Sequence, residues 1–208
     1  MPNAILDPTG QADRTSAGPA FTLARRRPGL RGARVGLLVN TKRNADLLLE
    51  EVGRLLMKEQ GAGSVMARTK LAFAQPVTED MLTELTTGCD VVVTGVGDCG
   101  SCSASAVTDG IMLEGRGIPA AVICSDAFGA SADAIASLRG APGYRYLTTP
   151  HPVAVLTPDE VRDRARQLVG DIVSLLASDG TAGGTADGTA DSTADGTAGG
   201  AADGEAAA

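Results

Sequence analysis

Hydrophobic and polar positions follow two repeating patterns within residues 34–178, and the patterns alternate along the chain. Short apolar runs predict strands, because a strand buried on both faces carries few polar residues. These runs lie at residues 34–40, 64–69, 90–95, 120–124 and 144–148. Apolar residues that recur at helical spacing predict amphipathic helices. They lie at residues 44–60, 78–86, 103–116, 127–138 and 158–176. Thr78 and Thr157 are the expected N-caps, and Gly117 and Gly140 follow helix ends.

Successive strand–helix units predict an α/β fold, a single doubly wound domain in three layers. Its sheet is expected to be five-stranded and mostly parallel, in the flavodoxin-like order 2-1-3-4-5. The domain occupies residues 34–178, after an irregular N-terminal arm at residues 1–33 and before a tail at residues 179–208. The tail repeats Thr, Ala, Asp and Gly and has no apolar residue larger than Ala, so we expect it to be disordered.

A doubly wound sheet binds ligands at the carboxyl ends of its strands, at the point where the strand order reverses. In the expected order this point lies between the first and third strands. The loop after the first strand is residues 40–44, and the loop after the third strand is residues 96–102. We expect these two loops to lie side by side and to form the site.

The composition excludes several function classes. The 208 residues are 43% hydrophobic and 2% aromatic, with a net charge of −7. The last thirty residues hold six acids and no Lys or Arg, which leaves 19 acids against 18 bases in the rest. We expect no nucleic-acid partner, because such partners need basic surfaces or stacking aromatic rings. We also expect no membrane partner, since no apolar run approaches roughly 20 residues. The basic cluster Arg25–Arg27 is expected to be solvated or to dock a subunit.

Cysteine usage predicts a cytoplasmic protein. The cysteines fall within one 36-residue stretch, which is too local for the disulfide framework of a secreted protein. The N-terminal segment has no signal-peptide pattern. The four residues are Cys89, Cys99, Cys102 and Cys124.

Cys99 and Cys102 form a Cys-x-x-Cys motif between a central strand and a helix. A helix N-terminus stabilises a thiolate, so Cys99 is the candidate nucleophile or redox thiol. Cys102 lies one turn on, where it can resolve a mixed disulfide or assist the first thiol. A zinc site would need two more ligands, and Cys89 lies at the far end of the strand. Burial of both thiols in packing is a third interpretation. We expect no metal.

The same loop also fits the dinucleotide-binding pattern GxGxxG over Gly95–Gly100, and Asp126 ends the next strand. Asp98 would place negative charge beside a pyrophosphate, and Cys99 would occupy the phosphate position. We therefore favour no cofactor. The glycines are instead expected to let backbone amides approach an anionic group such as a substrate carboxylate.

The Cys-Gly-Ser-Cys loop resembles the UGSC family, named after selenocysteine-Gly-Ser-Cys, in which Cys replaces selenocysteine in many members. The matching residues are Gly97–Ser103, Asp109, Glu114 and Gly117–Pro119, with Lys42–Ala45 upstream and His151–Pro152 downstream. The resemblance covers about residues 34–176 and leaves the arm and the tail outside. It implies a redox or thiol-dependent enzyme in which Cys99 holds the selenocysteine position.

Four polar residues near this loop are candidates for supporting roles. Lys42 is expected to lower the pKa of Cys99, to hold a carboxylate, or to lie free on the surface. Asn44 either binds substrate or caps the first helix. His151, the single histidine, is either a proton donor and acceptor or structural. Asp98 either relays protons or caps the helix that follows it.

These residues together predict a thiol-dependent enzyme of small-molecule metabolism, secondary metabolism included. Its substrate is a small molecule, with a carboxylate-bearing one as a candidate, and the chain is expected to form homo- or hetero-oligomers. The alternatives are a non-redox lyase or isomerase and a non-catalytic partner subunit; a dinucleotide-binding domain is less favoured. The expected substrate-binding residues in the loop are Gly97, Gly100, Ser101 and Ser103.

Overall fold

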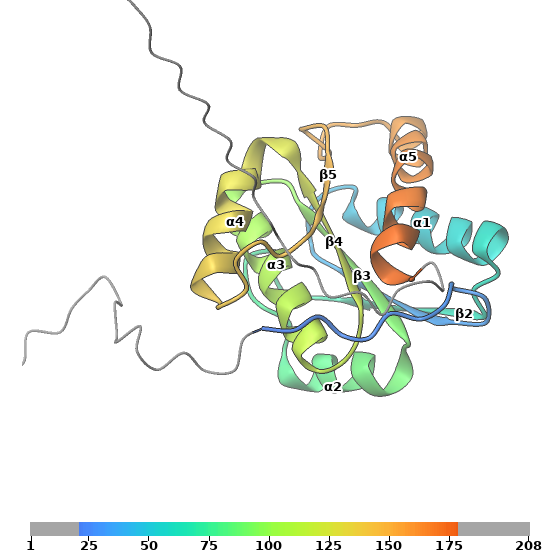
Figure 1. The fold of residues 1–208 in the computed structure, drawn as a ribbon. Helices are drawn as coiled ribbons and strands as arrows, with labels where there is room; N and C mark the ends of the chain where they lie inside the picture. The colour runs from blue at the N-terminus through green and yellow to red at the C-terminus, as the bar shows by residue number, and fades with distance from the viewer. Residues whose placement is uncertain (1–20, 179–208) are drawn as a thin grey trace, which may run out of the picture.

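Five parallel strands form one sheet in the order β2-β1-β3-β4-β5 in the computed structural model, which describes residues 21–178 (Figure 1). The strands are β1 (Arg34–Val39), β2 (Ser64–Thr69), β3 (Val91–Gly97), β4 (Ala120–Ser125) and β5 (Leu147–Thr149). Every neighbouring pair runs parallel. The expected α/β class and flavodoxin-like strand order are confirmed.

Helices cover both faces of this sheet, as a parallel sheet requires. They are α1 (Ala45–Gln60), α2 (Glu79–Gly88), α3 (Gly100–Gly115), α4 (Gly129–Leu138) and α5 (Pro158–Leu176), with a short 3-10 helix η1 (Asp126–Phe128). In Figure 1, α1 and α5 lie together on one side of the sheet and α3 and α4 on the other. α2 packs with α3 on that second side through a separate apolar cluster. The three-layer prediction is confirmed.

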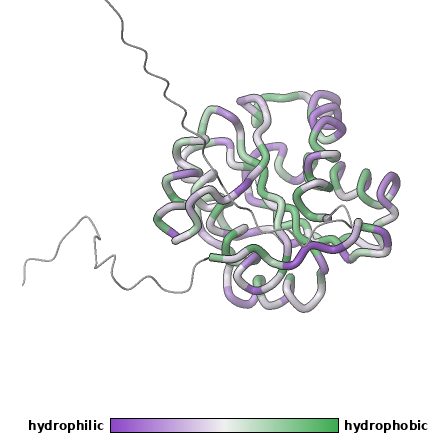
Figure 2. Tube along the Cα trace, viewed as in Figure 1, coloured by the Kyte–Doolittle hydropathy of each residue, from purple (hydrophilic) through white to green (hydrophobic). Residues whose placement is uncertain are grey.

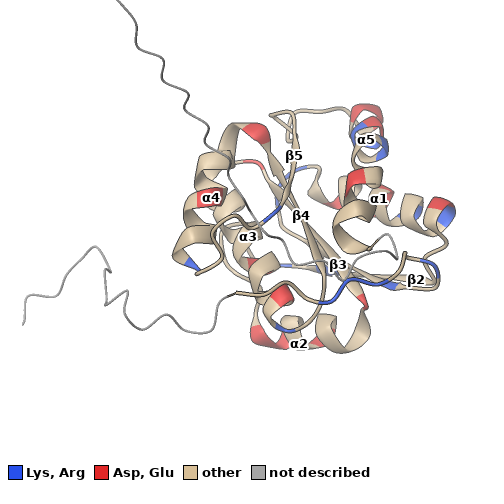
Figure 3. Cartoon of the chain, in the orientation of Figure 1, with Lys and Arg blue, Asp and Glu red and all other residues tan. Residues whose placement is uncertain are grey.

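The core explains why the apolar runs become strands. All seven residues of β3 are buried, and β4 is buried along its whole length. Leu37, Val93 and Ile123 each lie at most 1% exposed, and burial of such side chains stabilises a fold by roughly 1.5–3 kcal/mol each. Figure 2 shows the hydrophobic colouring concentrated on the central strands. Figure 3 shows the charged residues mainly on the outer helices and the loops.

Most helix ends follow the expected signals. Thr78 caps α2 by accepting a hydrogen bond from the Met81 amide, and Thr157 forms a reciprocal capping box with Glu160 at α5. The main difference is α3, which begins at Gly100 rather than at residue 103. The cause is the Cys99 sulfur, which accepts the Cys102 amide and so caps the helix earlier. Cysteine is not among the usual N-capping residues, so the sequence pattern did not predict that α3 begins at Gly100.

Residues 21–33 of the arm are irregular, apart from a bridge between Arg27 and Ala177, but they are packed against the domain. Ala24 and Leu30 are buried. The expectation that the basic cluster is solvated or docks a subunit is wrong for Arg26, whose guanidinium binds the buried Glu114 at 2.7 and 2.8 Å. Residues 1–20, predicted to be an irregular part of the arm, and the tail at residues 179–208, predicted to be disordered, lie outside the described residues.

Glu114 joins three segments through its carboxylate. Its oxygens accept hydrogen bonds from the Ala24 amide at 2.7 Å and from the Ala120 amide at 2.9 Å, besides the two from Arg26. The side chain of Glu114 is 0% exposed and that of Arg26 is 16% exposed. The arm, the end of α3 and the start of β4 therefore meet at one buried charge, so Glu114 has a structural role.

We predict that Arg26→Ala lowers the free energy of unfolding by about 3–5 kcal/mol, because it leaves the Glu114 carboxylate buried without its cation. Urea denaturation at neutral pH measures the change. The matched control is Arg116→Ala, since Arg116 pairs with Glu79 where both side chains are about half exposed. That change is expected to cost less than about 1 kcal/mol. Equal effects in the two variants would contradict the role of the buried charge.

Candidate functional site

The loops after β1 and β3 lie side by side at the carboxyl edge of the sheet, as expected. Asn40 joins them. Its backbone amide donates to the Gly95 carbonyl at 3.1 Å, and its side-chain amide donates to the Val96 carbonyl at 2.8 Å. Its side-chain oxygen accepts the Lys42 amide at 3.1 Å. Asn40 is 4% exposed, so this connection is a buried part of the fold.

Cys99 and Cys102 form a disulfide at the first turn of α3. The backbone N–H of Cys102 also donates to the Cys99 sulfur at 3.3 Å. Cys99 is partly exposed, whereas Cys102 is 0% exposed. The exposed Ser101 places its hydroxyl 3.5 Å from the Cys99 sulfur. When the bond is reduced, the sulfur that solvent reaches is therefore the one held at the positive end of the helix.

The glycine and serine that flank the motif are packing residues. Gly97 is buried in β3, and a β-carbon there would lie 2.7 Å from both the Cys124 sulfur and the Ser103 hydroxyl. Ser103 is 0% exposed. The expectation that Ser103 and Gly97 bind substrate is therefore wrong, because α3 packs directly against β3 and β4 at these residues. Gly100 and Ser101 remain open to solvent at the start of the helix.

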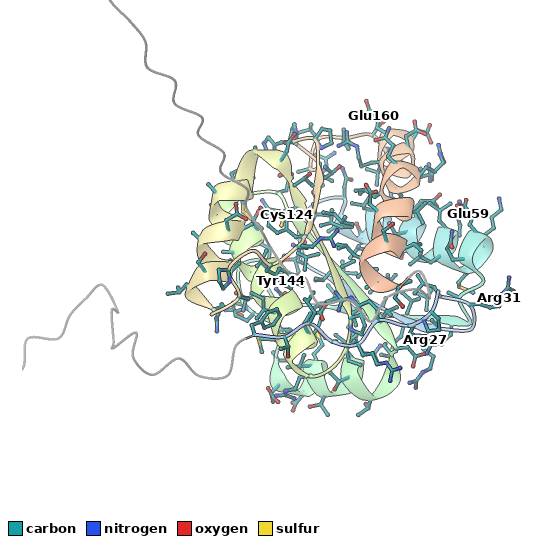
Figure 4. The ribbon with its side chains drawn as sticks, viewed as in Figure 1. Arg27, Arg31, Glu59, Cys124, Tyr144 and Glu160 are labelled. Carbon is teal, nitrogen blue, oxygen red and sulfur yellow. A yellow bond between two sulfur atoms is a disulfide. The ribbon has the colours of Figure 1, made fainter. Side chains whose placement is uncertain are left out.

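Cys124 supports the same close packing. It lies on β4 within the apolar cluster beneath α3 and α4, together with Tyr144, and Figure 4 labels both side chains. Burial raises the pKa of the Cys124 thiol to about 12. Cys89 is buried in the α2 cluster, and burial likewise raises its pKa. Both thiols are thus protonated and inert at neutral pH, as expected for packing residues.

Asp98 anchors the loop that follows β5. Its carboxylate accepts hydrogen bonds from the Val153 amide at 3.1 Å and the Ala154 amide at 2.9 Å, and it lies 3.0 Å from Nδ1 of His151. Burial by itself raises the pKa of Asp98, but these hydrogen bonds outweigh it and hold the pKa below its usual range. The expectation that Asp98 caps α3 is wrong, because its oxygens are turned to residues 151–154 and Cys99 is the cap.

His151 is held from several sides. Nδ1 faces Asp98 at 3.0 Å and the Ser125 hydroxyl at 3.3 Å, and the backbone amide donates to Asp126 at 3.0 Å. The edge of the Phe128 ring meets the imidazole at a centroid distance of 5.2 Å. The side chain is still 36% exposed. Because both side-chain contacts use Nδ1, Nε2 is the nitrogen that a bound molecule can reach.

The side chains of Asn44 and Lys42 have partners that the sequence did not predict. Asn44 has a left-handed backbone (φ 69°), and its side-chain amide donates to the carbonyls of Val153 and Leu156, both at 2.9 Å. The expectation that Asn44 caps α1 is wrong, because its side chain makes no capping hydrogen bond, whereas its expected role in substrate binding stays a prediction. The Lys42 ammonium lies 5.1 Å from the centre of the Phe73 ring, in the loop after β2, and is not in contact with Cys99.

Several residues of this edge were missed by the sequence analysis. Ser125 ends β4 and also donates to the Gly97 carbonyl at 3.1 Å. Lys70 directly follows β2, is buried, and donates to Asp109 at 2.5 Å and to Ser105 at 2.8 Å. Burial raises the pKa of Asp109, although Lys70 opposes the shift. Asp109 is among the residues that resemble the UGSC family. No feature of the sequence near Lys70, however, predicts that Lys70 pairs with a side chain of α3.

Within residues 21–178, no group of three or more His, Cys, Asp or Glu side chains is arranged to hold a metal ion. No helix in that part of the chain is both long enough and apolar enough to cross a membrane.

A family model described as the UGSC family matches residues 4–178. The match begins within the arm, which corrects the expectation that the resemblance starts at residue 34. No curated protein matches the chain.

Three solved structures are similar to the chain at low identity. A flavodoxin-like domain from Synechococcus sp. is 14% identical, with 67% of this chain and 90% of that chain covered and a TM-score of 0.38. A diflavin flavoprotein A3 from Nostoc sp. is 15% identical, with 73% and 95% covered and a TM-score of 0.39. RecJ from Thermus thermophilus, solved with Mn2+, is 16% identical, with 76% of this chain but 23% of that chain covered and a TM-score of 0.40.

We predict that Asp98→Asn lowers the free energy of unfolding by about 1.5–3 kcal/mol at neutral pH, because a neutral amide cannot replace the charged acceptor of several hydrogen bonds. The pKa of Asp98 is depressed in the folded state, so its stabilisation is present above the unfolded pKa of about 4 and is lost as the pH falls through the lower folded value. The difference between the two proteins should therefore shrink in acid.

Urea denaturation of both proteins from neutral pH down to about pH 3 measures this difference. Asp163→Asn is the control, since Asp163 is 60% exposed and pairs with Arg166 at the surface. The control is expected to stay within about 0.5 kcal/mol of the parent at every pH. A gap between parent and Asp98→Asn that does not change with pH would count against an ionised Asp98.

Proposed function

The chain belongs to the UGSC family, and from this premise we propose that it is a thiol-dependent enzyme of the oxidoreductase type that acts on small molecules. Cys99 is the nucleophile and Cys102 is the resolving thiol. The observation that carries the proposal is the disulfide between a partly exposed Cys99 and a fully buried Cys102 at the carboxyl edge of β3. A substrate can then reach the first sulfur only, and the second can act only on the first.

The reaction that fits this arrangement is reduction of a small-molecule disulfide. The Cys99 thiolate attacks one substrate sulfur, the substrate S–S bond breaks, and one thiolate leaves. Cys102 loses its proton and attacks the Cys99 sulfur, which releases the second substrate thiolate and forms the Cys99–Cys102 disulfide. The substrate gains two electrons and two protons. Two equivalents of an external low-molecular-weight thiol then return the protein to the dithiol state.

His151 is proposed to move the protons through Nε2. Its Nδ1 lies against the Asp98 carboxylate at 3.0 Å, an arrangement that favours a proton on Nδ1 and a basic Nε2. Asp98 and Ser125 act as positioning residues, because they touch the imidazole rather than the reacting sulfur. The contacts from Asp126 and Phe128 fix the ring further. The edge thus offers a thiol and an oriented base on neighbouring loops.

We predict different outcomes for the two cysteines when the reduced protein meets dithiodipyridine, a neutral disulfide. The parent should release two thiopyridones per chain and end as the internal disulfide. Cys102→Ser should release one and retain the other as a stable mixed disulfide on Cys99, because no resolving thiol remains. Cys99→Ser should react more than about tenfold more slowly, since Cys102 is buried. Absorbance and intact mass measure these products.

Cys89→Ala is the matched control, because Cys89 is a buried thiol far from the motif. It should keep the stoichiometry of the parent. Release of two thiopyridones by Cys102→Ser would show that another thiol resolves the adduct and would contradict the role of Cys102. Unchanged reactivity in Cys99→Ser would overturn thiol catalysis at this loop and leave the partner-subunit interpretation.

A further inference from the structure

A second feature of the carboxyl edge is a pocket between the loops that follow β1 and β2, with a volume of about 470 Å³. Its lining comes from the end of β1, the following loop, the start of α1 and the end of β2. The residues are Val39, Asn40, Thr41, Lys42, Arg43, Asn44, Asp46 and Thr69. Neither cysteine of the motif lines it, so this pocket is distinct from the disulfide itself.

The pocket is lined by cations that the fold leaves without partners. Among the described residues neither Lys42 nor Arg43 forms an ion pair, although eight arginines elsewhere do. Lys42 meets only the face of Phe73 through its ammonium. Asp46 is the one acid in the lining, and one of its oxygens accepts the Leu47 amide at 2.8 Å. Two unpaired cations against one acid give the pocket an excess of positive charge.

The surroundings of Cys99 are less favourable for binding an oxyanion than this pocket is. The ionised carboxylate of Asp98 directly precedes the thiol and repels a second negative charge. Gly97, whose amide was expected to approach such a group, is buried against Ser103 and Cys124. The hydroxyls of Thr41 and Thr69 and the side chain of Lys42 make the pocket the better site.

Asn40 connects this pocket to the thiol. It lines the pocket, and its amide lies 2.8 Å from the Val96 carbonyl. Val96 precedes Cys99 by three residues, which span at most about 11 Å of extended chain. A small molecule can therefore place one end in the pocket and another at the Cys99 sulfur.

We propose that this pocket binds an oxyanion of the substrate, so that the substrates are small disulfides that carry a carboxylate or phosphate group. The proposal rests on the proposed function, because it names the class of molecule that Cys99 attacks. Lys42 and Arg43 supply the attraction, and Asn40 fixes the distance from the pocket to the thiol loop.

The test compares two disulfides on the reduced full-length protein. Dithiobis(nitrobenzoate) carries carboxylates, and dithiodipyridine is neutral. The measured quantity is the ratio of their rates of reaction with Cys99. In the double variant Lys42→Gln/Arg43→Gln we expect this ratio to fall at least about tenfold, because the anionic probe alone loses its attraction. The matched control is Lys58→Gln, which removes a cation from the last turn of α1, the helix that follows Lys42 and Arg43, and should leave the ratio within about twofold.

Calorimetric titration with inorganic phosphate and with acetate identifies the oxyanion. Binding of either one that is lost in the double variant and kept in Lys58→Gln supports the proposal and names the group. A ratio that does not change in the double variant, or an equal fall in Lys58→Gln, overturns it. If Cys99→Ser reacts with both disulfides as fast as the parent does, the proposed function fails. The titrations with phosphate and acetate then still measure binding in the pocket. If neither phosphate nor acetate binds the parent, or if binding is unchanged in the double variant, the pocket is not an oxyanion site. This conclusion does not depend on the reaction rates of Cys99.

Discussion

The ionised carboxylate of Asp98 is the interaction on which the site depends. It lies at the end of β3 and accepts the amides of Val153 and Ala154, which belong to the loop after β5. Asn44, at the end of the β1 loop, donates to the carbonyl of the same Val153. Side chains from the loops after two strands therefore hold both backbone groups of Val153 in a third segment. Because His151 lies two residues before Val153 and is hydrogen-bonded to Asp98, its ring position is fixed by the same carboxylate.

The four cysteines show that environment, rather than residue type, determines thiol chemistry. Cys89 and Cys124 are enclosed by apolar side chains, and burial raises the pKa of each. Cys99 stands at a helix start with one face open, and Cys102 is enclosed but within bonding distance of it. Asp98 disfavours a thiolate next to it, although its carboxylate is directed to the amides of residues 153 and 154. The Cys102 amide, which donates a hydrogen bond to the Cys99 sulfur, favours the thiolate.

The sequence predicted the parallel sheet, its strand order and the meeting of the loops at residues 40–44 and 96–102, because these follow from period and connectivity. It did not predict the side-chain pairs that close the structure. Glu114 with Arg26 and Asp109 with Lys70 are separated by 88 and 39 residues, and neither partner carries a local signal. The same reasoning misjudged the capping role of Asn44 and the exposure of Ser103. Asn is a common helix cap and Ser a common ligand contact. Tertiary packing instead turned the Asn44 side chain to the loop after β5 and buried Ser103.

The distribution of charge along this edge bears on how a substrate would be oriented. The ionised Asp98 directly precedes Cys99 in the chain, and in the proposed reaction the Cys99 thiolate adds a second negative charge. Lys42 and Arg43 line the neighbouring pocket without carboxylate partners among residues 21–178. An anionic molecule is repelled by the first region and attracted by the second, so its uncharged, reactive end is the part that turns toward Cys99. The buried amide of Asn40 keeps the two regions at a constant separation, which gives this orientation a fixed geometry.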